Sequence, residues 1–327
     1  MNVEGTRAVL RPLGVGEVLD RAVTLSVKNF VVLATIFVVY AIPLGIAQFF
    51  ASQGLVGMLS KIQVSLAASS AAGKPADPAA LAHAFASLGS VGGWYPAFIL
   101  VAFLISPLPT AALIEACTAL YLGRATTFAL AYRTALERWS KLIALGLLYM
   151  ASGIALYVVV LILVFVLAFA IAFVTSAVKT LGIALAVGVV VLATVASIAF
   201  FIVAALAWQV SYFTCVVEGA GPVASFRLGL RRVFVGVGPK RSMLVGLAFF
   251  AILIGIALVT LVGEATLAAV THSPLVGTIY ETLVRVATAA FTTAFIAIFY
   301  FDLRVREEGL DLQLDAARAR GTPVPTV

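Results

Sequence analysis

The sequence predicts an all-α, polytopic integral membrane protein. Of its 327 residues, 63% are hydrophobic and 11% are charged, and the mean hydropathy is +1.16. A soluble domain is close to half apolar and a quarter charged, so this chain has too little polar surface to cover a soluble particle. The apolar residues also come in runs of about 20 or more, the length of a helix that crosses a bilayer. With only two cysteines, a disulfide-stapled secreted scaffold is excluded.

Six apolar runs qualify as membrane spans. We predict them at about 29–50, 94–121, 142–178, 181–217, 243–262 and 282–301. Pro43 should kink the first span, and Pro107 and Pro109 should interrupt the second. Residues 1–315 then form a single membrane domain, and the tail at 316–327 is expected to be disordered.

The stretch from 142 to 217 admits two interpretations. It carries one charge, Lys179, and each half would be about 55 Å long as a single helix. That length exceeds the bilayer, yet each half is short for two spans and a turn. We predict two long helices, tilted or projecting beyond the membrane, with the turn at Lys179 and Gly182. Four short spans are the alternative, and both leave the flanking segments on one side.

The basic residues are strongly biased to one side of the predicted membrane. Seventeen basic residues lie in four segments, namely the two terminal segments, the second connection and the fourth connection. The opposite loops hold 3. The positive-inside rule therefore places both termini in the cytoplasm. The first thirty residues do not have the pattern of a signal peptide, so the first span should be retained as an anchor.

Three basic, amphipathic segments each directly precede a long apolar run: 15–28, 128–141 and 222–233. Such segments are too polar to span and should lie in the interface with the apolar face buried. The sequence thus predicts three interfacial helices, each followed by a two-span hairpin, as a pseudo-threefold repeat. The simpler alternative is that basic juxtamembrane helices are common in any multi-span protein.

The basic side chains of these segments are candidates for contacts with anionic lipid headgroups. Each such charge near an anionic surface contributes about 1 kcal/mol. Three of them occupy comparable places in the three segments: Arg21, Arg133 and Arg227. The full candidate set is Arg21, Lys28, Arg133, Arg138, Arg227, Arg231 and Arg232.

Charged residues inside spans are costly and are functional candidates by default. Glu115 could be a proton or cation site, or it could snorkel or pair with Arg124. Arg285 lies one helical turn from Glu281, so the two could form a functional polar site or simply an internal ion pair. Glu264 is another possible partner.

The chemistry of an enzyme is not evident. His83, His272, Cys117 and Cys215 are far apart in the sequence, so we predict no metal site and no cofactor. The chain has no HExxH, GxSxG or Walker sequence, and no GxGxxG between a strand and a helix. We therefore predict no enzymatic activity. Nucleic-acid binding is also not expected, since no soluble basic domain is present.

Three motifs resemble those of a known family: RPLGVGEVLDRA at 11–22, EGAG at 218–221 and YFDLRVREEGLDL at 300–312. The family is named for the membrane domain of glycerophosphoryl diester phosphodiesterase and is bacterial and archaeal. The resemblance implies the membrane part alone, in a prokaryotic cytoplasmic (inner) membrane, without the metal-dependent phosphodiesterase barrel fused to it in some relatives. It supplies no functional residues.

Three functions are compatible with these features. The first is a non-enzymatic scaffold or accessory subunit that binds lipid and another membrane protein complex. The second is a transporter or lipid-handling protein, with a broken-helix site formed by Pro43, Pro107, Pro109 and Glu115. The third, a membrane anchor for a separate hydrolase, rests on the family resemblance alone.

Overall fold

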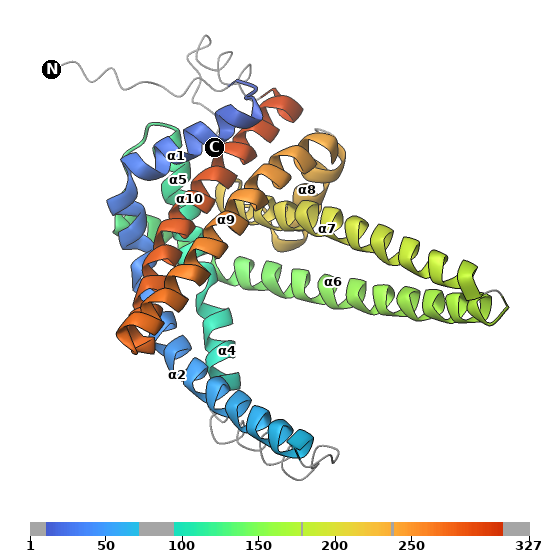
Figure 1. The fold of residues 1–327 in the computed structure, drawn as a ribbon. Helices are drawn as coiled ribbons and strands as arrows, with labels where there is room; N and C mark the ends of the chain where they lie inside the picture. The colour runs from blue at the N-terminus through green and yellow to red at the C-terminus, as the bar shows by residue number, and fades with distance from the viewer. Residues whose placement is uncertain (1–10, 72–94, 178, 237–238, 310–327) are drawn as a thin grey trace.

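The computed structural model describes residues 11–71, 95–177, 179–236 and 239–309, and every regular element in these ranges is helical. Six helices in this part of the chain are long and apolar enough to cross a membrane, as expected of a multi-pass membrane protein. The elements, drawn in Figure 1, are α1 (Val15–Lys28), α2 (Phe30–Ala71), α4 (Tyr95–Ile105), α5 (Pro107–Tyr121), α6 (Phe128–Ala177), α7 (Lys179–Val217), α8 (Pro222–Arg231), the π-helical turn η1 (Arg232–Gly236), α9 (Pro239–Thr271) and α10 (Pro274–Glu308).

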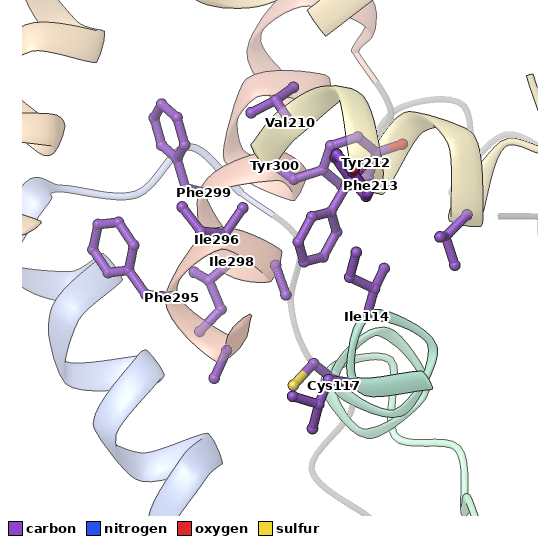
Figure 2. Close-up of a cluster of buried hydrophobic side chains, with 14 of the residues drawn as sticks. Ile114, Cys117, Val210, Tyr212, Phe213, Phe295, Ile296, Ile298, Phe299 and Tyr300 are labelled. Atoms are coloured by element: carbon purple, nitrogen blue, oxygen red, sulfur yellow. The ribbon is translucent and has the colours of Figure 1, made fainter. Parts of the chain in front are cut away.

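The core is built around α10, which packs against α1, α2, α5, α7 and α9. Seven consecutive residues of α10, from Phe295 to Phe301, are buried on every side of the helix. Aromatic side chains fill the space between helices: Phe249 of α9 stacks on Phe295 at 4.4 Å, and Phe213 of α7 lies 5.5 Å from Tyr300. Figure 2 shows buried side chains of α5, α7 and α10 in this cluster, among them Ile114, Phe213 and Ile296.

The helices α6 and α7 form a hairpin that extends away from this core, as Figure 1 shows. We call its outer part, residues 151–173 and 186–201, the arm. Nearly all side chains of the arm are exposed. With 50 residues, α6 is about 75 Å long. The prediction of two long helices is confirmed, and the alternative of four short spans is wrong.

Several helices are longer than the predicted spans. Helix α2 continues past Phe50 to Ala71, with Pro43 inside it. Helices α9 and α10 likewise extend beyond 243–262 and 282–301. The difference arises because an apolar run marks only the part of a helix suited to hydrocarbon, whereas the helix itself continues until a breaker. The predicted interruption of the second span is confirmed, since α4 ends at Ile105 and α5 begins at Pro107.

The three predicted interfacial segments do not share one structure. The first and the third are separate helices, α1 and α8. The segment at 128–141 instead forms the first turns of α6 with no break before the apolar stretch. The repeat therefore stays a prediction. The tail at 316–327 lies outside the described residues.

Candidate functional site

Two polar networks tie the helices together where α1, α8, η1 and the last turns of α10 meet. The first is centred on Asp302, whose side chain is fully buried. Its Oδ1 accepts hydrogen bonds from the Leu13 backbone N–H at 2.8 Å and from Arg306 at 3.0 Å. Its Oδ2 accepts two from Arg241, at 2.6 and 3.1 Å. Both arginines also donate to the Leu13 carbonyl. We call this group the Asp302 clamp; it joins the lead-in to α1 with α9 and α10.

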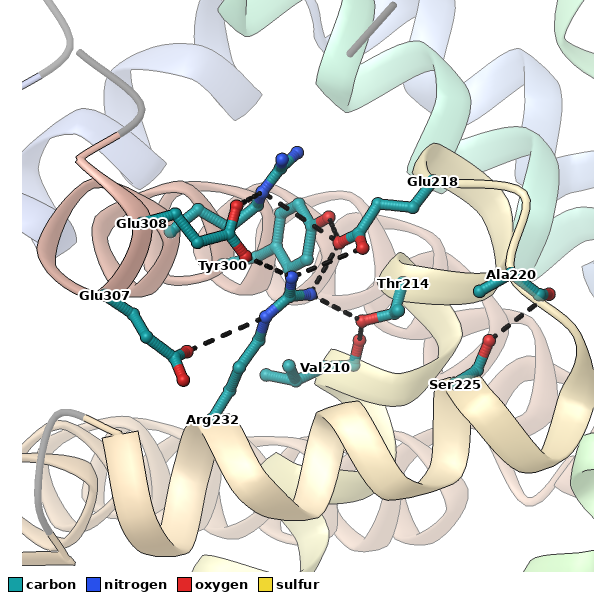
Figure 3. Close-up of polar contacts among 10 residues, drawn as sticks. Val210, Thr214, Glu218, Ala220, Ser225, Arg232, Tyr300, Glu307 and Glu308 are labelled. Atoms are coloured by element: carbon teal, nitrogen blue, oxygen red, sulfur yellow. Dashed lines mark hydrogen bonds and ion pairs between the residues drawn. The ribbon is translucent and has the colours of Figure 1, made fainter. Parts of the chain in front are cut away.

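The second network surrounds Arg232, which is 3% exposed. Its guanidinium donates to Glu218 at 2.5 Å, to the Thr214 hydroxyl at 3.0 Å, and to Glu308. The Tyr300 hydroxyl donates to the same Glu218 carboxylate, and Figure 3 shows all of these groups pointing toward one another. Burial lowers the pKa of Arg232, but the hydrogen bond and negative charge of Glu218 raise it more, so its pKa lies above the ordinary arginine value.

The buried charged groups of both networks, Asp302 and Arg232, are bonded to internal partners, so the networks fix the helices in place. A glycine adds to this packing. A Cβ built on Gly229 of α8 would overlap the Ser211 hydroxyl and lie 2.9 Å from the Ala207 carbonyl oxygen of α7. Only glycine therefore allows α8 to lie directly on α7 here.

A cavity of about 560 Å³ opens between α2, α5, α7, α9 and α10. Its volume is in the range of small-molecule binding sites. The lining residues of α10 run from Glu281 to Ile296, a rise of about 22 Å. The cavity is therefore elongated along the helices that are apolar enough to span the membrane. Its apolar lining includes Phe37, Leu113, Ile114, Phe213, Leu253 and Ile296.

One end of the cavity is charged. Arg285 forms an ion pair with Glu281 one turn away, and both side chains are about three-quarters buried. The same Arg285 nitrogen donates to the side-chain oxygen of Gln48 on α2, and the Gln48 amide donates to Glu281 at 3.0 and 3.1 Å. These three side chains form a closed triad between α2 and α10.

Four other polar side chains line the cavity without a partner among the described residues: Gln209, Glu264, Thr288 and Thr292. Among the described residues, neither Glu264 of α9 nor Gln209 of α7 has a hydrogen bond or ion pair. Three threonines of the wall differ from them, because Thr110, Thr260 and Thr293 donate to their own helix backbone four residues earlier. Glu264 and Gln209 are half-buried, and a polar group that is partly removed from water without a partner is destabilising. The cavity thus presents unused hydrogen-bonding capacity.

The structure separates the two predicted intramembrane sites. Glu281 and Arg285 line the cavity as an ion pair. Glu115 is half-buried on α5, has no ion pair among the described residues, and does not line this cavity. None of the three prolines predicted to form a broken-helix site lines it either.

The predicted headgroup residues fall into three groups. Lys28, Arg133, Arg227 and Arg231 are exposed. Two others bind protein groups: Arg21 donates to Glu17 at 2.9 Å, and Arg138 donates to the Cys215 carbonyl at 3.0 Å. For Arg232 the prediction of a headgroup contact is wrong, because its guanidinium is buried among acidic side chains.

Sequence reasoning missed Gln48, Gln209 and Asp302. A neutral glutamine inside an apolar run is a usable signal, since a buried amide requires a partner.

The described residues contain no cluster of three or more His, Cys, Asp or Glu side chains that could hold a metal ion. What the cavity can do chemically is bind an elongated, mainly apolar molecule with a polar end. The chain matches no protein-family model, no curated protein and no solved structure, so the family resemblance rests on its three motifs.

Proposed function

We propose that this chain is a non-enzymatic, multi-pass membrane protein that binds an amphiphilic small molecule or lipid in the cavity between α2, α5, α7, α9 and α10. One observation carries the proposal: the cavity combines a long apolar wall with a charged end and unpartnered polar side chains. Such a wall suits a hydrocarbon chain, and such an end suits a headgroup. Lipid handling therefore accounts for the geometry better than scaffolding alone.

The remaining parts of the proposal concern orientation. The bias of basic residues supports placing α1 and α8 at the cytoplasmic face of a prokaryotic inner membrane. There α1, α8 and the start of α6 would lie against anionic headgroups through their exposed basic residues. The charged end of the cavity would then lie toward the opposite face.

The test is native mass spectrometry of the chain extracted from its own membrane with bound species retained. We expect one lipid-sized species per chain. Ala257 and Ala289 both line the cavity, so A257F and A289F should fill it and remove the bound species. Ala155, which is exposed on the arm, provides the matched control: A155F should retain it. Equal retention by all three variants would contradict the proposal.

A second candidate function is a scaffold or accessory subunit that docks another membrane protein through the arm. The observation that favours it is the exposure of an apolar hairpin longer than the bilayer is thick. A photo-crosslinking residue at Phe165 of the arm should give a protein adduct of one defined mass in native membranes. The same residue at Leu283, which is exposed on α10, should not. Lipid adducts alone at both positions would rule this function out.

A further inference from the structure

We infer that the cavity selects amphiphiles with a cationic ammonium headgroup, held at the end where Glu264 and Glu281 lie, with the hydrocarbon chain extending toward Phe213 and Ile296. The inference rests on the proposed function, because it names the class of molecule that the cavity would take.

The charges that line the cavity do not balance. They are two carboxylates, Glu264 and Glu281, and one guanidinium, Arg285. Because Arg285 is paired with Glu281, the negative charge of Glu264 has no counter-charge among the described residues. Glu264 is half-buried, and a partly buried charge attracts an opposite charge more strongly than a charge in bulk water does. A cation from the ligand would complete the site.

An anionic headgroup fits this end poorly. Arg285 already donates to both Glu281 and Gln48, so a phosphate or carboxylate would have to break the triad to reach it. It would then face two carboxylates. Placing an anionic headgroup next to these two carboxylates is unfavourable, because like charges repel. The triad therefore acts as a neutral wall, and the selectivity comes from Glu264.

The position of Glu264 is fixed by close packing of α9 on α10. A Cβ built on Gly277 would lie 3.0 Å from the Glu264 Cγ, so the glycine leaves room for this side chain between the helices. A headgroup site benefits from such a constraint, because a fixed carboxylate loses little conformational freedom on binding.

Charge is confined to one end of the cavity. Beyond that end the wall has no charged side chain and combines threonines with apolar residues such as Leu113, Phe213 and Ile296. Gln209 adds one neutral amide in this deeper part, which can hydrogen-bond a hydroxyl or carbonyl but does not discriminate charge. A linear amphiphile matches this order of groups, with its headgroup at Glu264.

The experiment compares three twelve-carbon probes of equal chain length: dodecylamine as its ammonium ion, dodecanol and dodecanoate. Binding is followed by the thermal stabilisation of the full chain in a non-ionic detergent and, independently, by native mass spectrometry. Wild type should bind dodecylammonium about tenfold more tightly than dodecanol, and dodecanoate most weakly. In E264Q this preference for ammonium over alcohol should disappear while dodecanol binding stays.

The control is E137Q, because Glu137 is an exposed carboxylate on α6, far from the cavity lining; its preference should equal that of wild type. If dodecanol or dodecanoate binds wild type as tightly as dodecylammonium, the inferred selectivity is overturned while cavity binding stands. If no probe binds, or if all three bind A257F as they bind wild type, the proposed function fails and the inference fails with it.

Discussion

Helices α10 and α6 are both long and apolar, yet α10 lies at the centre of the molecule and α6 extends out of it. In α10, 44% of the most apolar stretch is buried, whereas in α6 none of it is. The helix with more charged residues is therefore the one inside. In a membrane, lipid tails are as apolar as leucine, so hydrophobicity gives a helix no reason to leave them.

The features that place α10 inside are shape and polar partners. Its aromatic side chains interlock with those of α7 and α9, and Asp302 supplies fully buried hydrogen bonds. The arm has far fewer such contacts: its residues are mainly Val, Leu, Ile and Ala with exposed side chains, and Phe200 and Phe201 at its base lie against Phe234 and Phe250. Matched substitutions in the two regions can test this contrast.

The largest effect should come from D302N. The change keeps the size of the side chain but leaves Arg241 and Arg306 without their counter-charge. Removing one partner of a buried ion pair typically costs about 3–5 kcal/mol, and we expect about 3 kcal/mol here because the two arginines are partly exposed. The free energy of unfolding in mixed detergent micelles measures it.

The control for D302N is E137Q. Glu137 also pairs with an arginine, Arg133, but both side chains are mostly exposed. Loss of the Glu137–Arg133 ion pair should change the unfolding free energy by less than about 0.5 kcal/mol. Equal effects of the two substitutions would mean that the Asp302 clamp is not a structural centre.

An intermediate effect should come from F295A, because Phe295 is fully buried against Phe249. Such a truncation costs about 3–5 kcal/mol in a soluble core. Part of that cost is transfer from water, which is absent when the unfolded helices stay in detergent, so we expect about 2 kcal/mol. F165A on the arm, where the side chain is 76% exposed, should leave the thermal midpoint unchanged. A comparable fall for F165A would show that the arm is packed in the detergent-solubilised protein.

The smallest effect should come from G229A. The added methyl group would overlap Ser211, and overpacking costs typically about 1–3 kcal/mol; we expect about 1 kcal/mol, since α8 is short and can shift. G153A on the arm, where a Cβ would meet nothing within 4 Å, should stabilise α6 slightly, by up to about 1 kcal/mol. Opposite signs in the two thermal midpoints support the contrast between the regions, and equal signs contradict it.

The features that could be predicted from the sequence are those that depend on composition and on the length of apolar runs. Each of the six predicted spans overlaps an apolar helical segment of the structure, because long apolar runs are countable; the second span is divided between α4 and α5. The choice of two long helices over four short ones followed from the lone Lys179 and the length of each half. The break at Pro107 followed from the lost N–H of proline.

The contacts that could not be predicted from the sequence are those between helices that are distant in the chain. Arg232 looked like a headgroup contact because basic residues outnumber acidic ones on its side. Its partners Glu218 and Glu308 are 14 and 76 residues away and come together only when α8 and α10 pack on α7. The Glu281–Arg285 pair was predictable from its spacing, whereas Gln48, 233 residues from Glu281, was not.

The Asp302 clamp has a consequence for the order in which the protein is made. The hydrogen bond from Leu13 to Asp302 joins residues 289 positions apart, so this anchor of α1 cannot form until α10 has been synthesised and inserted. The α6–α7 hairpin, by contrast, joins two helices that follow each other in the chain and can complete its insertion while ribosomes are still translating α9. The core therefore cannot be completed until the last helix is in place. A chain stopped before Pro274 would contain five of the six apolar helices in full and still lack α10, around which the core is built.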